Sequence, residues 1–356
     1  MTGEAKTLRR GWTTGACAAA AAKSACSALL GRGFLDPVSI VLPKGEEPSF
    51  ALETSSTGEG WAEAGIIKDA GDDPDVTHGA LIIARVSFGE AGQGLRFHAG
   101  SGVGTITKPG LPLAIGEPAI NPGPRLMIDQ AISDVLLETG RAPDLDVTIS
   151  IRDGEALALK TWNGRLGIVG GLSVLGTTGI VRPFSCSAWI ASIHRGIDVA
   201  VASGTEHVIA ATGSSSEHAA REIYGLGEEE CLDMGDFAGG VLKYLRKHPV
   251  PRLTISGGIG KMTKLAQGAS DLHSGRSQVD FERLADMAAD LGFDRAPVVG
   301  ANTAMEVFQI CGAPLAQEIA QEARNVAIGF LKGAPVEVET IVIDRAGIIV
   351  ARAGFS

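Results

Sequence analysis

The chain has 356 residues, of which 45% are hydrophobic, so it can bury a substantial core and is long enough for two domains of ordinary size. The 41 acidic residues outnumber the 31 basic ones and give a net charge of −10, which disfavours a protein that binds nucleic acid by neutralising phosphates. The 48 glycines follow no collagen-like period and indicate many special turns instead of a fibre.

Cysteine usage and hydropathy both indicate a cytoplasmic protein. The five cysteines form no C-x-x-C pair, and an odd number in a chain of this length fits reduced thiols better than disulfides or a structural zinc site. No segment has about 18 consecutive strongly apolar residues, the length that a membrane-spanning helix requires. We therefore expect no membrane association.

The first element predicted is a helix of small residues over 15–30. Arg9-Arg10 before the alanine-rich stretch is reminiscent of an export signal, but Lys23 interrupts that stretch. Thr13 or Thr14 stands where a helix N-cap belongs.

The remainder of residues 1–160 predicts a mixed α+β domain. Short alternating runs separated by Pro, Gly and Asp predict strands at 38–42, 61–67 and 81–88. An apolar stripe predicts a helix near 123–139. Asp153-Gly154 between two apolar runs predicts a hairpin formed by 147–151 and 156–159.

Residues 161–356 predict a Rossmann-like α/β domain with a mostly parallel sheet. From about residue 165 the pattern of strand, glycine loop and helix repeats, which is typical of parallel strands joined by crossover helices. Ligands of such sheets bind at the carboxyl ends of the strands, so the loops are expected to converge. Residues 336–343 and 348–351 predict a second hairpin, whose domain the sequence does not fix.

One pair of these loops has the spacing of a cofactor site. Asp233 ends a predicted strand about 20 residues after Gly213 ends another, an arrangement by which Rossmann-like sites bind a cofactor and its ribose hydroxyls. No complete G-x-G-x-x-G is present, so ordinary connecting turns remain the alternative. The adenosyl-cofactor hypothesis uses Gly213, Ser214, Ser215, Ser216, Asp233 and Asp236.

Two further loops combine glycines with lysine. Residues 102–110 place Lys108 among glycines and hydroxyls, which suits a carboxylate or phosphate but also describes a surface turn. Residues 257–263 resemble the end of a P-loop, yet Met262 stands where Ser or Thr is required. An anion held by Lys261 and Lys264 is the remaining functional interpretation.

The connection 116–125 contains three prolines, and its stiffness would hold Glu117, Asn121 and Arg125 at fixed positions, as a binding site needs. The loop 69–78 gathers carboxylates and an imidazole. It lacks the glycine and terminal Glu of a calcium loop, which leaves either a turn capped by Asp side chains or a proton acceptor at Asp75 or His78.

Five motifs in order along nearly the whole chain closely resemble the CbiD family, the cobalt-precorrin-5B C-1 methyltransferases of cobalamin biosynthesis. These motifs are Arg9 to Ala20, Gly71 to Thr77, Gly102 to Leu111, Gly116 to Arg125 and Gly167 to Val181. The resemblance implies transfer of a methyl group from S-adenosylmethionine to C-1 of a cobalt corrinoid, with cobalt present only as part of the substrate.

The resemblance also assigns expected roles to residues. The substrate carries several carboxylates, so the cations in or beside the loops are expected to bind it, together with polar neighbours. The substrate set is Arg9, Arg10, Thr13, Thr14, Lys108, Glu117, Asn121, Arg125, Arg182, Lys261 and Lys264. Thr177, Thr178 and Gly179 join the donor set, and Asp75 and His78 are candidates for a base or orienting group.

The first domain is thus expected to bind the macrocycle and the second the methyl donor. Two other classes stay open: an enzyme dependent on NAD or another nucleotide that uses the same loops, and a non-catalytic corrinoid carrier. The sequence fixes no oligomeric state, and a homo-oligomer is compatible with it.

Overall fold

The computed structural model describes residues 8–137 and 143–355. The chain forms two compact units, Met1–Ser185 (unit 1) and Cys186–Ser356 (unit 2). None of the helices in the described ranges has the length and apolar character needed to cross a membrane.

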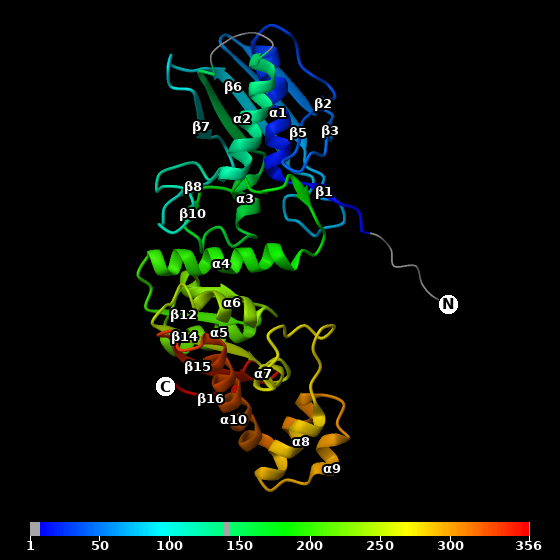
Figure 1. Ribbon diagram of the computed structural model, residues 1–356, viewed down its shortest axis with the longest axis vertical. Helices are drawn as coiled ribbons and strands as arrows, with labels where there is room; N and C mark the ends of the chain where they lie inside the picture. The colour runs from blue at the N-terminus through cyan, green and yellow to red at the C-terminus, as the bar shows by residue number, and fades with distance from the viewer. Residues whose placement is uncertain (1–7, 138–142, 356) are drawn as a thin grey trace, which may run out of the picture. The chain divides into compact units, whose positions relative to one another are not determined.

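Unit 1 is a five-stranded sheet covered on one face by two helices, with short strands and loops gathered at one end of it (Figure 1). Its elements are β1 (Gly11–Trp12), α1 (Thr14–Leu29), β2 (Val38–Ser39), β3 (Ser49–Phe50), β4 (Thr54–Gly58), β5 (Trp61–Ile67), β6 (Leu81–Phe88), β7 (Leu95–Ala99), β8 (Thr105–Ile106), α2 (Pro122–Leu137), β9 (Leu145–Ile151), α3 (Gly154–Ala158), β10 (Ile168–Val169) and β11 (Ile180–Val181). The sheet order is β4-β5-β6-β9-β7, in which β7 and β9 run parallel and the other pairs antiparallel.

The small residues of α1 explain how this unit packs. Thr13 caps the helix, since its hydroxyl accepts the N–H of Ala16 at 3.2 Å. The alanines of α1 other than Ala28 are fully buried, which lets the helix lie close against β5, β6 and α2. The predicted small-residue helix is therefore confirmed.

Two expectations for this half of the chain are wrong. The segment after Asp153 is the short helix α3 and not the second strand of a hairpin, because Gly154 packs against the backbone of Gly102. The units also divide at residue 185 instead of 160. Strands β10 and β11 pair with β8 and β1, so residues 161–185 belong to unit 1.

Unit 2 is an α/β domain with a five-stranded sheet in the order β13-β12-β14-β15-β16. Its elements are α4 (Cys186–Ala202), β12 (His207–Ala211), α5 (Ser214–Tyr224), η1 (Glu228–Glu230), β13 (Cys231–Asp233), α6 (Ala238–Leu245), β14 (Arg252–Gly258), α7 (Ile259–Ala266), α8 (Phe281–Asp290), α9 (Arg295–Val299), α10 (Ala304–Leu331), β15 (Glu337–Ile343) and β16 (Ile349–Ala353). Strands β12 to β15 are parallel, and β16 is antiparallel to β15. The mostly parallel sheet is confirmed, and the C-terminal hairpin completes it.

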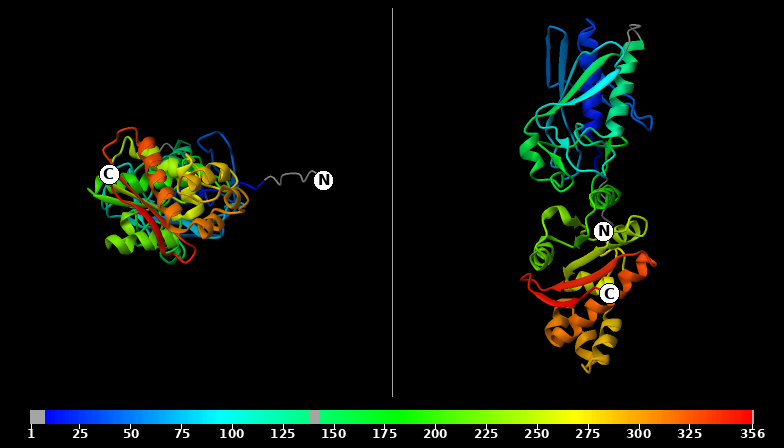
Figure 2. Two further views of the ribbon diagram at one scale, coloured as in Figure 1. Left: turned by 90° about the horizontal axis from the view of Figure 1, so that it is seen from below. Right: turned by 90° about the vertical axis from the view of Figure 1, so that its left-hand side faces the viewer.

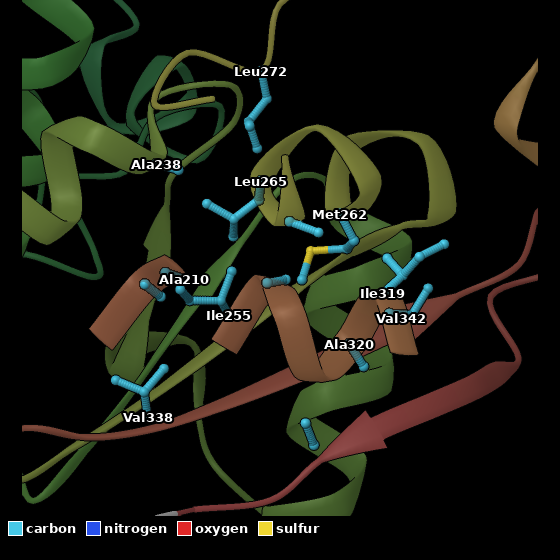
Figure 3. Close-up of a cluster of buried hydrophobic side chains, with 14 of the residues drawn as sticks. Ala210, Ala238, Ile255, Met262, Leu265, Leu272, Ile319, Ala320, Val338 and Val342 are labelled. Carbon is cyan, nitrogen blue, oxygen red and sulfur yellow. The ribbon is translucent and has the colours of Figure 1, made fainter. Parts of the chain in front are cut away.

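Helices cover both faces of this sheet. Helix α5 packs on one face against β12, β14 and β15, while α10 lies along β15 and β16 (Figures 1 and 2). The larger core lies between the sheet and α6, α7 and α10, where Ile255, Met262, Ile319 and Val338 meet (Figure 3). The positive φ of Gly312, two residues before Pro314, breaks α10 within its length.

Candidate active site

The carboxyl ends of three parallel strands in unit 2 bring glycine-containing loops together. After β12, the Thr212 N–H donates to the Ser256 oxygen of β14 at 2.9 Å. After β13, the Gly235 N–H donates to the Ala211 oxygen of β12 at 3.1 Å. The predicted convergence is confirmed for the loops after β12, β13 and β14, but the glycine loop after β10, expected with them, belongs to unit 1. Ala211 and Asp233 lie directly opposite each other in the ladder.

The backbone at Gly213 has open space beside it. Gly213 is exposed and extended, and a Cβ built there, or at Gly258, would meet no atom within 4 Å. Helix α5 begins at the next residue, so its N–H groups point toward this opening. Ser214 and Ser215 are exposed there, whereas the buried Ser216 donates its hydroxyl to the Gly213 oxygen at 2.8 Å.

Two lysines expected to bind substrate lie in unit 2, beside these loops. The Lys261 ammonium donates to the Thr212 oxygen at 2.9 Å and lies 3.1 Å from an oxygen of Asp236. Lys264 is buried and donates to the Leu272 oxygen at 2.7 Å; burial, with Lys261 nearby, lowers its pKa. Both lysines therefore hold the loops in place from within.

At one end of unit 1, the first and last motifs meet. The Thr13 N–H donates to the Gly179 oxygen at 2.9 Å, and the Gly15 N–H to the Leu175 oxygen at 3.2 Å. A Cβ on Gly176 would lie 2.4 Å from the Thr13 side chain, so the two segments touch. Thr177, Thr178 and Gly179, expected with the donor loops, thus share unit 1 with Thr13 and Thr14, whereas Gly213 belongs to unit 2.

The stiff connection before α2 joins the same group of segments. Asn121 donates both its backbone N–H and its side-chain amide to the Val174 oxygen, at 3.0 and 3.2 Å. Arg125 donates to the Glu117 carboxylate at 2.8 Å and to the Ile120 oxygen at 2.8 Å. Its guanidinium is therefore already paired within the protein, and Glu117 orients it.

Lys108, Arg10 and Arg182 are further cations of unit 1 that were expected to bind the substrate. The aliphatic stem of Lys108 lies against Gly167, where a Cβ would come within 2.5 Å of it. Arg10 and Arg182 are exposed, so their charges reach solvent.

The acidic loop 69–78 is held by charge pairs on both sides. Arg9 pairs with Asp69 and holds the pKa of that carboxyl down, at about 2. Lys68 is buried and donates to both Asp75 and Thr77. Burial alone would raise the pKa of Asp75, but the charge and hydrogen bonds of Lys68 outweigh it, so the pKa is lowered.

The imidazole of His78 has a defined hydrogen-bonding role in this loop. Its Nδ1 accepts the Ala70 N–H at 3.1 Å, so the neutral ring carries its proton on Nε2. The side chain is half exposed. Neutral His78 therefore offers a donor, and Asp75 is a weak base.

Sequence reasoning missed three residues around these sites. Lys68 was overlooked, although a lone lysine after the apolar run of β5 and beside Asp69 is a signal of a buried charge pair. Phe184 was also missed: it has a φ of 55°, and its N–H donates to Asp73 at 2.8 Å. Trp189 of α4 was missed as well: its indole N–H donates to the Asp233 oxygen at 2.9 Å. Across residues 8–137 and 143–355, no three His, Cys, Asp or Glu side chains are grouped as a metal ion would need.

The chain matches known protein families and named relatives over most of its length. The family model described as CbiD matches residues 1–183, and the model of the CbiD C-terminal domain matches residues 271–354. A protein of Paramagnetospirillum magneticum named cobalt-precorrin-5B C(1)-methyltransferase is 59% identical over 97% of this chain and 98% of its own length. A protein of Rhodospirillum rubrum with the same name is 58% identical over 99% of both chains.

A solved structure of the cobalamin biosynthesis protein CbiD from Archaeoglobus fulgidus is 28% identical, with a TM-score of 0.42 over 76% of this chain and 83% of that one. The family assignment rests on the sequence matches, which span both units. The chain belongs to the CbiD family.

Proposed function

We infer that this protein is an S-adenosylmethionine-dependent methyltransferase that methylates C-1 of cobalt-precorrin-5B, giving cobalt-precorrin-6A in cobalamin biosynthesis. The observation that carries this inference is the match, at 58–59% identity and over nearly the full length, to relatives named for that reaction. The sulfonium is an activated donor, so the protein has to align an electron-rich ring carbon with the methyl group and exclude water. All five cysteines are free thiols, which supports action in the reducing cytoplasm.

The methyl donor is assigned to the strand ends of unit 2. The open backbone at Gly213 and Gly258 fits a ligand that approaches the main chain closely, and Asp233 stands opposite the end of β12 where a ribose acceptor is needed. Ser214 and Ser215 are exposed at the start of α5, and Asp236 follows β13 at the neighbouring strand end. When bound, S-adenosylmethionine supplies the methyl group, and these residues hold and orient it.

The corrinoid is assigned to the motif end of unit 1. Arg10, Arg182 and Lys108 offer positive charge there to the carboxylates of the ring periphery. Arg9 and Arg125 are oriented by Asp69 and Glu117, so they present fixed N–H groups. Thr13, Thr14, Asn121 and the segment 177–179 frame this end of the unit.

Within this site we assign His78 the role of a donor through Nε2, and Asp75 that of holding Lys68 and Thr77 in place. The low pKa of Asp75 supports a positioning role more than proton abstraction. An Asp75→Ala, His78→Ala double variant that keeps the full rate would remove both residues from the reaction.

Two measurements test the two assignments separately. Calorimetry should show that Asp233→Ala weakens S-adenosylmethionine binding while Arg10→Ala leaves it unchanged, and unchanged affinity in Asp233→Ala would remove Asp233 from the donor site. Anaerobic incubation with cobalt-precorrin-5B and methyl-labelled S-adenosylmethionine should place the label on C-1. Corrinoid binding without label transfer would indicate a carrier, and binding of NAD or ATP in place of the methyl donor would indicate a different enzyme.

A further inference from the structure

Trp189 lies where the apolar stripe of α4 runs past the end of the sheet. Residues 189, 193 and 197 share one face of the helix, since they are four residues apart. Ile193 and Ile197 are buried in the core of unit 2, with 3% and 0% of their surface exposed, while 46% of Trp189 is exposed. The stripe therefore ends in a large aromatic ring that the core does not cover.

The ring is nevertheless held in a fixed position over the end of β13. Its Nε1–H donates to the Asp233 oxygen at 2.9 Å, and its centroid lies 6.1 Å from that of Phe237, with the ring planes 53° apart. Gly235, with a φ of 55°, lies beneath the indole: a Cβ there would be 3.3 Å from the ring. These contacts fix the ring beside the loop assigned to the donor.

A fixed, half-exposed indole suits one particular ligand feature. Aromatic faces attract cations, and Trp does so most strongly of the three aromatic side chains. The donor carries a positive sulfonium, while the product of methyl transfer carries a neutral thioether at the same position. An indole near that sulfur would therefore discriminate between the two.

We propose that the face of Trp189 binds the sulfonium of S-adenosylmethionine and makes this site prefer the methyl donor over S-adenosylhomocysteine. The inference rests on the donor site assigned above. The attraction disappears once the methyl group has left, because the sulfur is then neutral, so the same ring that favours donor binding does not retain the product.

The test compares dissociation constants for both ligands in three forms of the full chain. In calorimetry, Trp189→Leu should weaken S-adenosylmethionine binding on the order of tenfold and S-adenosylhomocysteine binding less than about twofold. Trp189→Phe keeps an aromatic face but loses the N–H, so it should retain most of the preference. Equal losses for both ligands would overturn the proposal, because the ring would then stack on the adenine or shape the loop.

A second experiment avoids any change of side-chain shape. Trp189 is the sole tryptophan of unit 2, since the other three (Trp12, Trp61 and Trp162) lie in unit 1. All four tryptophans are replaced by fluorinated tryptophan analogues. Each added fluorine lowers the negative electrostatic potential of the ring face, so the preference for S-adenosylmethionine should fall stepwise. A preference independent of fluorination would also overturn the proposal.

The Asp233→Ala variant distinguishes an error in the donor site from an error in the role of Trp189. If Asp233→Ala weakens the binding of both ligands, while the Trp189 variants leave the ratio of the two dissociation constants unchanged, the donor site is supported and the role of Trp189 is refuted. If neither Asp233→Ala nor the Trp189 variants alter either ligand, the assignment of the donor to these strand ends fails as well.

Discussion

The ammonium of Lys261 donates a hydrogen bond to the backbone oxygen of Thr212 at 2.9 Å, which joins the first turn of α7 to the end of β12. The same ammonium lies 3.1 Å from an Asp236 oxygen, an ion pair without the angles of a hydrogen bond. One lysine thus connects the loops that follow β12, β13 and β14.

Lys261→Met should loosen these loops. We expect a loss of about 1–2 kcal/mol in the free energy of unfolding, mostly from the hydrogen bond, because a side chain exposed by 36% gains little from its ion pair. Binding of S-adenosylmethionine should weaken as well. Urea unfolding and calorimetry measure the two effects, and Lys243→Met on the exposed surface of α6 is the matched control. Equal stability of the two variants would contradict this role for Lys261.

The adjacent glycines 170 and 171 are required for different reasons. A Cβ on Gly171 would lie 2.4 Å from the backbone carbonyl of Gly102, which no side-chain rotation relieves. Gly170 has a φ of 85° with open space around it. Gly171→Ala should therefore cost about 3 kcal/mol or more of unfolding free energy, and Gly170→Ala about 1–2 kcal/mol. Denaturant unfolding of both variants checks the order, and a larger loss in Gly170→Ala would refute it.

Acid should destabilise unit 1 through the loop 69–78. The pKa values of Asp69 and Asp75 are lowered in the folded protein, to about 2 for Asp69, from an unfolded value of about 3.9. Their stabilisation is present above pH 4 and is lost as the pH falls through the folded pKa values. Unfolding measured between pH 6 and pH 2, in roughly half-unit steps, should show this decline.

Asp75→Asn should flatten that decline and also lower stability at pH 7. It leaves the buried Lys68 ammonium without its carboxylate, which we expect to cost about 3 kcal/mol. Asp129→Asn, on an exposed position of α2, is the control and should change neither quantity. A variant as stable as the parent at pH 7 would mean that Lys68 does not depend on Asp75.

Both tyrosines should have raised pKa values while the protein is folded. Burial and the hydrogen bond to Glu339 raise the pKa of Tyr224 to about 12, and burial with the hydrogen bond to Asp198 raises that of Tyr244. The chain has two tyrosines in all, so absorbance of the phenolate reports on both. Because these pKa values are raised, the stability they contribute is full below pH 10 and lost as the pH rises through them. A phenolate step near pH 10 with retained circular dichroism would contradict this, and Tyr244→Phe would assign it.

The sequence predicted the elements whose signals are local. Alternation gave β5 and β6 at their observed bounds, and Thr13 marked the start of α1. The hairpin predicted at Asp153-Gly154 was wrong, because the conformation there depends on the close approach of Gly154 to Gly102, which is distant in sequence. The contact of residues 177–179 with Thr13 was missed for the same reason, because Thr13 lies at the opposite end of unit 1 in sequence.

The sequence predicted the residue types of the binding candidates, but not their hydrogen-bond partners. The loop sequences identified Lys261 and Arg125 as candidate cations, yet only the fold reveals that they donate hydrogen bonds to Thr212 and Glu117. Trp189 shares an apolar helix face with Ile193 and Ile197, and that pattern alone does not distinguish a buried ring from an exposed one. Its exposure depends on where the sheet ends, which no local pattern records.

The place of β15 within its sheet has a consequence for synthesis of the chain. Strand β14 is buried and pairs with β15 along seven residues, yet β15 is made only after α7 to α10 have been added. On the ribosome, β14 therefore emerges with one side unpaired, whereas every strand of unit 1 is already available. Unit 1 can fold while translation continues, and unit 2 depends on the last strands to be translated.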